Sequence, residues 1–406
     1  MSLIEGSAPV AAEPSANTAT QPDRRAAVRP RRIWRRILVA SLVVVLLMLA
    51  GTIGVGYYFS GGLLTIDNSV SYPVTVKAIN GDEVTLSRDE ETQRPVLVGL
   101  VWDGGSAILS KSVRVNGEDV VRNVTRIVSG SLRAGMSAAI DSRVFGPDPA
   151  SRDLSFDAVN VRGELGDMPA WYVPPTAAAV SSTWVIAIHG RAASRTETLR
   201  ILPAIAATGM PALAISYRND VGTPGSPDGY YHLGDTEWRD VVAAIDYARA
   251  HGATGVVLYG WSMGGGLTLT ALRRMPPTDV AFVKAVVLDS ASIDWTTILD
   301  FQGGKRGLPG FVTWTAERII EWRADLALAD VDQRPYAPQI KMPMLVCIDQ
   351  DDQTVPTGPA MEFARSRPDL VTLVTTAGGG HTASWNVDPQ RYESTVSTFL
   401  ARFTGI

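Results

Sequence analysis

From residue 184 onward the chain repeats one pattern, in which a short and wholly apolar segment is followed by a helix-forming segment. A strand that is apolar at every position has both faces buried, and such strands occur mostly in parallel sheets covered by helices on both sides. The pattern therefore predicts an α/β domain with a mostly parallel sheet. The expected strands are residues 184–188, 212–216, 256–259, 282–288, 344–348 and 370–374, and the clearest helices are residues 197–207, 236–250 and 391–403.

A second feature is the run of residues 37–59, which contains no charged side chain. An apolar run of about 20 residues or more is long enough to cross a bilayer as one helix. Arginines cluster before the run and residues 60–76 contain no Lys or Arg, so the positive-inside rule puts the N-terminus in the cytoplasm. We expect a single-pass cell-membrane protein with a disordered basic cytoplasmic tail (residues 1–36), a transmembrane signal-anchor helix (residues 37–59) and an extracytoplasmic remainder.

A cleaved signal peptide is the competing interpretation of the same run. The run is longer than the usual apolar core of a signal peptide, and no convincing small-x-small cleavage site marks its end. The uncleaved anchor is therefore our prediction.

Residues 60–150 are expected to form a small β-rich domain. Apolar residues alternate there at every second position between turn signals, as in strands with one buried face. Asn80-Gly81 and Asn116-Gly117 stand between such segments, and Asn-Gly favours a tight hairpin turn. Because the stretch carries no catalytic constellation, a spacer, a partner-binding module and a wall of the substrate path all stay open as roles.

Composition excludes several classes of function. The formal net charge of −4 leaves no basic footprint for nucleic acid. The single cysteine, Cys347, rules out an intrachain disulfide and a cysteine-based zinc site, and its apolar neighbours predict a small buried side chain. We expect neither a metal nor an organic cofactor.

The candidate nucleophile is Ser262, in Gly260-Trp261-Ser262-Met263-Gly264, between the strand expected at 256–259 and a helix expected from Met263. A sharp strand-to-helix turn leaves room only for small residues two positions before and two after its serine, as Gly260 and Gly264 provide. The helix N-terminus would also face an oxyanion that forms beside the serine. In a chain with 37 glycines the G-x-S-x-G pattern can arise by chance, so the strand–helix context carries the prediction.

A serine nucleophile needs a base, and the chain contains four histidines. His381 lies in a glycine-rich loop after the last expected strand and before the last helix, which suits a base. The other three have plainer roles: His189 suits the organisation of the loop after its strand, His232 lies in a Pro/Gly-rich loop, and His251 ends a helix.

The acid that orients the histidine should follow a late strand, between Ser262 and His381 in the chain. The loop after the strand at 344–348 offers three aspartates, Asp349, Asp351 and Asp352. A solvated acidic loop is the alternative interpretation of this cluster.

Together these residues resemble the α/β-hydrolase superfamily of serine hydrolases over about residues 157–406. The resemblance rests on His189-Gly190, the turn at 260–264, Val355-Pro356 after the aspartates, and His381, in the superfamily's order of nucleophile, acid and histidine. The doubled glycine at 265–266 and the segment 231–240 are similar to the branch that contains acyl-ester and acyl-thioester hydrolases and prolyl-oligopeptidase-like peptidases. The implied fold is an α/β-hydrolase domain over residues 151–406, preceded by the transmembrane helix and the small all-β domain.

The resemblance also assigns the remaining roles. The superfamily's acid lies four residues before the proline of the Val-Pro pair, which selects Asp352; Asp351 is the fallback, and Asp349 occupies a position where glycine is usual. The backbone N–H groups of Met263 and Arg191 would form the oxyanion hole.

The implied activity is hydrolysis of an acyl ester or thioester through an acyl-enzyme intermediate, with an acyl-type small molecule or a lipid as substrate. An exopeptidase with the same triad is the first alternative, and a membrane-tethered binding protein without catalysis is the second. Residues 290–336 lie where an insertion commonly caps the active site of this fold. Trp295, Trp314 and Trp322 therefore either line an acyl pocket or belong to a packed helical layer.

Overall fold

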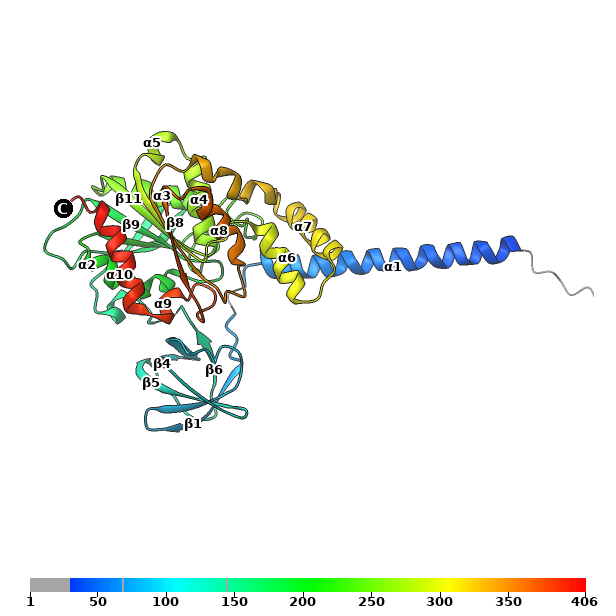
Figure 1. Cartoon of the computed structure of the whole chain (residues 1–406), viewed down its shortest axis with the longest axis horizontal. Helices are drawn as coiled ribbons and strands as arrows, with labels where there is room; N and C mark the ends of the chain where they lie inside the picture. The colour runs from blue at the N-terminus through cyan, green and yellow to red at the C-terminus, as the bar shows by residue number, and fades with distance from the viewer. Residues whose placement is uncertain (1–29, 68, 144) are drawn as a thin grey trace, which may run out of the picture. The chain divides into compact units, whose positions relative to one another are not determined.

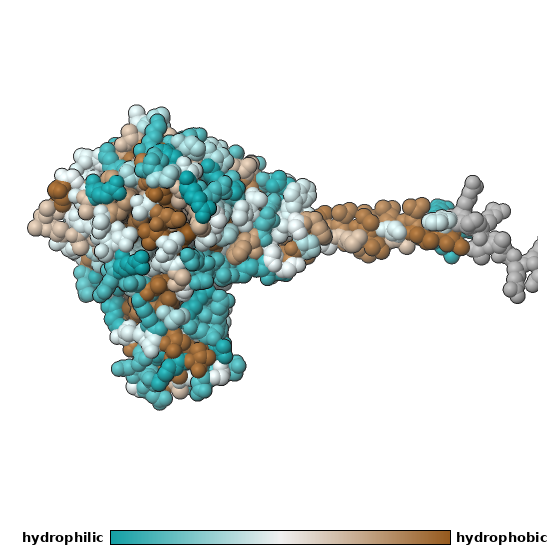
Figure 2. Space-filling model, in the orientation of Figure 1, coloured by the Kyte–Doolittle hydropathy of each residue, from teal (hydrophilic) through white to brown (hydrophobic). Residues whose placement is uncertain are grey.

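A computed structural model describes residues 30–67, 69–143 and 145–406, so most of the predicted tail lies outside the described residues. The first helix, α1 (Pro30–Leu64), includes the predicted membrane run and begins before it. In the described ranges it is the one helix long and apolar enough to cross a membrane, and apolar side chains cover its visible face in Figure 2. A signal anchor and a signal sequence both satisfy this description.

Residues 52–406 form one compact unit, and its first part is a closed barrel of antiparallel strands in the order β1-β2-β5-β4-β3-β6. The expectation of a small all-β domain is confirmed. The predicted Asn-Gly turns join β1 to β2 and β4 to β5, with Gly81 and Gly117 in the left-handed region at φ 61° and 60°. The strands are β1 (Val74–Asn80), β2 (Glu83–Ser87), β3 (Val98–Trp102), β4 (Gly105–Asn116), β5 (Asp119–Ser129) and β6 (Ser137–Asp141).

Apolar side chains fill the barrel together with one buried arginine, Arg122 on β5. Its guanidinium donates to the carbonyl oxygens of Thr92 (3.3 Å), Arg94 (2.9 Å), Val96 (2.5 Å) and Ser110 (2.5 Å). Because these partners carry no negative charge, burial lowers the pKa of Arg122 to about 10. The arginine thereby fastens the loop between β2 and β3 to the barrel.

The second part of the unit is built on an eight-stranded sheet in the order β14-β13-β12-β11-β9-β10-β8-β7. The strands from β14 to β10 are parallel. At one edge β8 pairs antiparallel with β10, and β7 pairs antiparallel with β8. The predicted mostly parallel sheet is confirmed. The strands are β7 (Asp157–Arg162), β8 (Asp167–Val173), β9 (Thr183–Ile188), β10 (Ala212–Ile215), β11 (Gly255–Trp261), β12 (Val283–Asp289), β13 (Met344–Asp349) and β14 (Val371–Thr376).

Helices cover both faces of this sheet, so alternate residues of each central strand enter different cores (Figure 1). In β9, Ile186 and Ile188 pack toward α3 (Trp238–Ala250), α4 (Met263–Arg274) and α8 (Thr357–Ser366), and Val185 and Ala187 pack toward α2 (Leu202–Ala207) and α10 (Pro389–Leu400). Cys347 on β13 is buried, as predicted. The helix predicted over 197–207 is divided into η2 (Arg195–Arg200) and α2, and that over 391–403 into α10 and η5 (Ala401–Phe403).

The segment between β12 and β13 contains two main helices, α6 (Trp295–Lys305) and α7 (Gly310–Ala324). Trp295 is buried and its indole N–H donates to the Leu233 carbonyl at 2.9 Å, so it belongs to a packed layer. Trp314 and Trp322 are 60% and 76% exposed. The short remaining helices are η1 (Pro149–Arg152), α5 (Pro277–Val280), η3 (Leu328–Val331), η4 (Arg334–Gln339) and α9 (Ser384–Val387).

Candidate active site

The candidate nucleophile lies at the junction of β11 and α4. Ser262 has φ 49° and ψ −119°, a conformation that is strained for any residue with a side chain. Its N–H donates to the Asp289 carbonyl at 2.9 Å, and its own carbonyl accepts from the Ser292 N–H at 3.0 Å. Strand β12 and its following loop thus hold the strained turn and expose the hydroxyl.

The glycines around Ser262 are required by backbone crowding. A Cβ added to Gly260 would lie 2.5 Å from the carbonyl oxygen of Gly264, and one added to Gly264 would meet the carbonyl oxygens of Ile188 and His189. These neighbours are backbone atoms, which cannot rotate away. The steric reason for the two small residues is therefore as the sequence indicated.

The structure brings Ser262, His381 and Asp352 together in one chain of hydrogen bonds. His381 Nε2 lies 2.9 Å from Ser262 Oγ, and His381 Nδ1 lies 2.8 Å from Asp352 Oδ2. With Nδ1–H donating to the carboxylate, Nε2 is left as an acceptor for the serine hydroxyl proton. Three loops that are far apart in the sequence supply this arrangement, which follows the ends of β11, β13 and β14.

Each aspartate of the 349–352 cluster has a different partner. Asp352 Oδ1 accepts from the N–H groups of Thr354 and Val355, both at 2.8 Å, so its other oxygen is fixed toward His381. Asp351 instead accepts from the N–H of Gly378 at 2.7 Å. The carboxylate that contacts the imidazole is that of Asp352, and the solvated-loop alternative is wrong for this residue because its side chain is 2% exposed.

Asp349 has a role that the sequence reasoning missed. Its fully buried carboxylate accepts from the N–H groups of Gly379 and Gly380, each at 3.0 Å, and from Thr376 Oγ1 at 2.7 Å. The two glycines directly precede His381, so Asp349 fixes the loop that carries the imidazole. The unusual aspartate at a position where glycine was expected was the signal that a local hydrogen-bond role existed.

The loop after β9 lies beside the candidate nucleophile. A Cβ added to Gly190 would be 3.0 Å from the Cβ of Ser262. The N–H of Gly190 is already engaged, because it donates to Glu197 Oε2 at 2.7 Å. The next N–H along the loop is that of Arg191, and Met263 supplies the first N–H of α4. Arg191 therefore lies in the loop next to Ser262, and Met263 lies at the helix N-terminus next to it.

His189 organises this loop and does not contact Ser262 Oγ. Its Nδ1 lies 2.8 Å from the Gly190 carbonyl and its Nε2 lies 2.7 Å from Asp220 Oδ2, and the ring stacks on Tyr217. Burial opposes protonation of this imidazole, but the charge and hydrogen bond of Asp220 outweigh it and raise the pKa of His189 above its usual value. The loop-organising role inferred for His189 fits these contacts.

A buried ion pair beneath the loop links it to the His381 segment. Glu197 and Arg200 are each 1% exposed and lie 3.4 Å apart. Arg200 also donates to the carbonyl of Thr382 at 2.5 Å and to Asn386 Oδ1 at 3.0 Å. Burial would raise the pKa of Glu197, but the guanidinium of Arg200 is chief among the groups that lower it overall. Neither residue was singled out from the sequence.

The segment 231–240, noted for its similarity, has a structural explanation. The carboxylate of Glu237 is buried and accepts from the N–H groups of His232 (2.7 Å) and Gly234 (3.0 Å). The carboxylate of Asp240 is buried and forms a pair with Arg218, whose Nε lies 2.8 Å from Asp240 Oδ2. Both acids hold loops in place, and neither contacts the Ser262–His381–Asp352 group.

His381 opens onto a cavity of about 460 Å³ with a polar lining. The three tryptophans of the β12–β13 segment are not among its lining residues, so the acyl-pocket interpretation of these aromatics is wrong for this cavity. Among the described residues that line it, Ile140 is the only aliphatic one, and the charged ones are Glu90, Glu91, Arg94, Asp141, Arg143 and Lys305.

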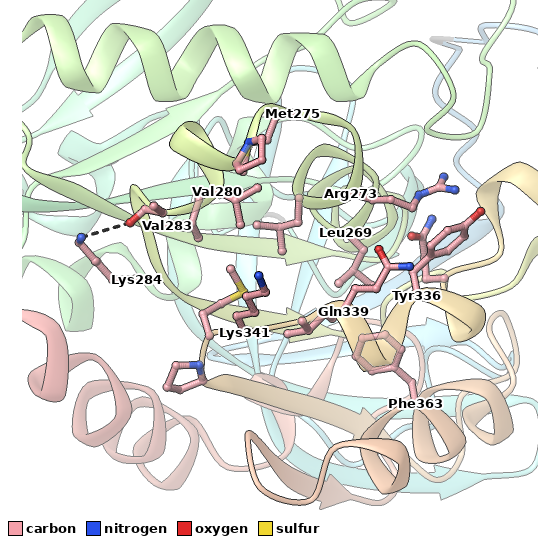
Figure 3. Close-up of a pocket in the computed structure, with 17 residues that line it drawn as sticks. Leu269, Arg273, Met275, Val280, Val283, Lys284, Tyr336, Gln339, Lys341 and Phe363 are labelled. Atoms are coloured by element: carbon pink, nitrogen blue, oxygen red, sulfur yellow. Dashed lines mark hydrogen bonds between the residues drawn. The ribbon is translucent and has the colours of Figure 1, made fainter.

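A second cavity, of about 720 Å³, lies between α4, the start of β12 and α8, and it is lined mostly by apolar residues (Figure 3). It includes Leu269, Val283 and Phe363 but none of Ser262, Asp352 and His381. It is therefore separate from the candidate active site. In the part of the chain that is described, no group of three His, Cys, Asp or Glu side chains is arranged to hold a metal ion.

Comparisons with known proteins agree with the α/β fold. A family model described as "Alpha/beta hydrolase family" matches residues 185–395, and one described as a domain of unknown function matches residues 75–141. Among curated proteins, acylamino-acid-releasing enzyme of Sus scrofa is 28% identical over 177 residues, which are 39% of this chain and 22% of that protein. The chain thus spans about a fifth of the length of this relative.

Among solved structures, an esterase of Pyrococcus furiosus is similar with a TM-score of 0.52 at 21% identity, over 64% of this chain and 96% of the esterase. A second crystal form of the same esterase gives a TM-score of 0.51 over 98% of its chain. At this identity the likeness concerns the fold.

Proposed function

Because the chain belongs to the alpha/beta hydrolase family, we propose that it is a serine hydrolase that cleaves an acyl ester or thioester, with Ser262 as nucleophile. The observation that carries the proposal is the hydrogen-bond chain from Ser262 Oγ through His381 to Asp352, with distances of 2.9 and 2.8 Å. A buried carboxylate, an imidazole and a hydroxyl in this order are the groups that acyl transfer needs.

In the proposed reaction, Ser262 Oγ bonds to the acyl carbon while its proton moves to His381 Nε2. The tetrahedral intermediate collapses, the bond to the alcohol or thiol breaks, and His381 returns the proton to that leaving group. A water molecule then gives its proton to His381 and its oxygen to the acyl carbon. The ester bond to Ser262 breaks, and the proton returns to Oγ.

The negative charge of each tetrahedral intermediate needs donors that are already in place. The N–H groups of Met263 and Arg191 are proposed for this role. Engagement of the Gly190 N–H by Glu197 supports the choice of Arg191, since it removes the nearest competing donor. Asp352 would keep the imidazole in the required tautomer and stabilise its protonated form.

An exopeptidase with the same triad is the second candidate. Two observations favour it: the relative named acylamino-acid-releasing enzyme matches over 177 residues, and the cavity next to His381 is lined by charged rather than aliphatic side chains. An ester with a long alkyl chain would find little apolar surface there. A short or polar acyl group fits either activity.

The location proposed for this chemistry is outside the cytoplasm, with α1 as a single-pass membrane anchor. The apolar helix and the arginines before it support this orientation. No metal or organic cofactor takes part in the proposed steps.

The test is labelling of the detergent-solubilised full chain with a fluorophosphonate probe, beside Ser262→Ala. We expect labelling that Ser262→Ala abolishes, and a kcat that Ser262→Ala and His381→Ala each lower by about 10³-fold or more. Absence of Ser262-dependent labelling would refute the enzyme proposal and favour a binding protein. Aminoacyl-anilides cleaved faster than p-nitrophenyl esters would reverse the order of the two candidate activities.

A further inference from the structure

The β-barrel contacts both loops that flank Ser262. In the short helix α9, which begins three residues after His381, the side-chain amide of Asn386 donates to the Leu97 carbonyl at 2.6 Å, and the Leu97 N–H donates back to the Asn386 carbonyl at 3.2 Å. Just after β6, Arg143 donates to the carbonyl of Ala192, in the loop that carries Arg191, at 3.3 Å. The barrel and the sheet belong to the same compact unit, so these are contacts within one body.

The contact nearest to the candidate base is made by Arg94, in the loop between β2 and β3. Its Nη1 donates to the carbonyl oxygen of Gly379 at 3.2 Å, and a Cβ added to Gly380 would collide with the same nitrogen. Its Nη2 is held by Glu90 at 2.8 Å and by Glu91 at 3.1 Å. Two carboxylates therefore orient the guanidinium that donates to the His381 loop.

The same two glycines are held from the opposite side by the sheet. Asp349 accepts the N–H groups of Gly379 and Gly380, whereas Arg94 donates to the Gly379 carbonyl. The peptide before His381 is thus fixed by an acceptor from β13 and a donor from the barrel. The proposed reaction needs the His381 imidazole to stay within hydrogen-bond distance of Ser262. The barrel contact restrains the loop that carries this imidazole.

The barrel also supplies much of the cavity onto which His381 opens. Seven lining residues come from the β2–β3 loop, from β6 and from the two residues after it: Glu90, Glu91, Arg94, Ile140, Asp141, Ser142 and Arg143. Three of them are acidic and two are basic, and Lys305 adds a cation from α6 on the other side. Such a lining offers hydrogen bonds and charges of both signs and almost no apolar surface.

We infer that the β-barrel contributes to the active site in two ways. Arg94 positions the His381 loop, and the charged barrel residues form a subsite for charged acyl groups, such as aminoacyl groups. The inference rests on the proposed function. It assigns a role to the segment matched only by a domain of unknown function, and Arg94 acts through the loop as a positioning residue.

The first experiment measures the rate of fluorophosphonate labelling of Ser262 in the full chain for the wild type, Arg94→Ala, Arg94→Lys and Arg114→Ala. Arg114 is the matched control, because it forms an ion pair with Glu83 on the barrel surface and does not line the cavity. We expect labelling to be about tenfold slower in Arg94→Ala, partly restored in Arg94→Lys and within twofold of the wild type in Arg114→Ala.

The outcomes separate this inference from the proposed function. Ser262-dependent labelling at the wild-type rate in Arg94→Ala, with an unchanged melting temperature, overturns the positioning role and leaves the serine hydrolase in place. Absence of Ser262-dependent labelling in the wild type overturns the proposed function itself. If Arg94→Ala does not fold, Arg94→Met takes its place, because it keeps an unbranched side chain and removes the donors: labelling about tenfold slower than in the wild type supports the positioning role, and labelling at the wild-type rate refutes it.

The second experiment tests the subsite with p-nitrophenyl esters in the wild type and in the double variant Glu90→Gln/Glu91→Gln. We expect kcat/KM to be at least about tenfold higher for an aminoacyl ester than for the octanoate. Because the two carboxylates also hold Arg94, we expect the double variant to lower kcat for the aminoacyl ester and the octanoate alike. KM should rise a few-fold for the cationic aminoacyl ester alone, and less so at high salt. A preference for the octanoate, or a KM that the double variant leaves unchanged, would refute the subsite.

Discussion

Replacement of Asp349 by asparagine tests how the His381 loop is held. Oδ2 of Asp349 accepts from Gly379 N and Thr376 Oγ1, and Oδ1 accepts from Gly380 N and Asp351 N. Whichever oxygen becomes the amide nitrogen, a glycine N–H that precedes His381 then faces a second donor. The substitution keeps the size of the side chain, so its effect reports on hydrogen bonding.

The magnitude follows from the buried donors left without an acceptor. One or two N–H groups lose their partner at about 1–3 kcal/mol each, so we expect the free energy of unfolding to fall by about 1–6 kcal/mol. For a domain of this size that corresponds to a melting temperature lower by roughly 2–24 °C. Displacement of the imidazole by a fraction of an ångström to 1 Å would slow the reaction by about 10- to 100-fold.

The assay is fluorophosphonate labelling at a temperature where the variant is folded, with thermal unfolding measured by circular dichroism. Asp351→Asn is the matched control, because Asp351 accepts only the N–H of Gly378 among the neighbouring glycines and is exposed to solvent. We expect the control to label within about threefold of the wild type. Labelling and a melting temperature that are the same in Asp349→Asn as in the wild type would refute the hydrogen-bond account of the loop.

Three further predictions concern the sheet and its ends. Burial raises the pKa of Asp289 to about 6, so the folded state binds this proton more tightly than the unfolded state and stability falls as the pH rises from about 4 to 6; Asp289→Asn should flatten that part of the melting-temperature profile, and an equally steep profile would contradict the assignment. Gly264→Ala should abolish labelling and lower the yield of folded protein, since its Cβ meets the carbonyls of Ile188 and His189, and normal labelling would show that the turn can relax. Burial raises the pKa of the Cys347 thiol well above its usual value, so reaction with Ellman's reagent should require unfolding; rapid reaction in the native state would contradict its burial.

The elements that were predicted correctly are those governed by local chemistry. Short and wholly apolar segments such as those at 184–188 and 344–348 are typical of strands buried on both faces, and β9 and β13 occupy them. The helix over 197–207 was wrong in one respect, because Ile201 separates η2 from α2. Local propensity does not fix such an interruption, and Arg200 at the end of η2 lies in buried contacts with Thr382 and Asn386, far along the chain.

The site was predictable where chain order and steric crowding limit the choice. Ser262 needed glycines on both sides, and His381 was the histidine in a loop between the last strand and the last helix. The choice between Asp351 and Asp352 was made by resemblance, and the distances of 2.8 Å from Asp352 to His381 and 2.7 Å from Asp351 to Gly378 now distinguish the two side chains.

The sequence by itself determined the class of sheet, the apolar helix near the N-terminus, the two Asn-Gly hairpins of the barrel and the small residues around Ser262. These features follow from periodicity, length and local crowding, which neighbouring residues in the chain decide. Only the tertiary structure decided that Asp349 holds the His381 loop, that Arg94 reaches it from the barrel and that charged side chains rather than tryptophans line the cavity. Those contacts join residues that are distant in the chain, 30 positions apart for Asp349 and Gly379 and 285 for Arg94 and Gly379, so they depend on how the strands, the loops and the barrel pack.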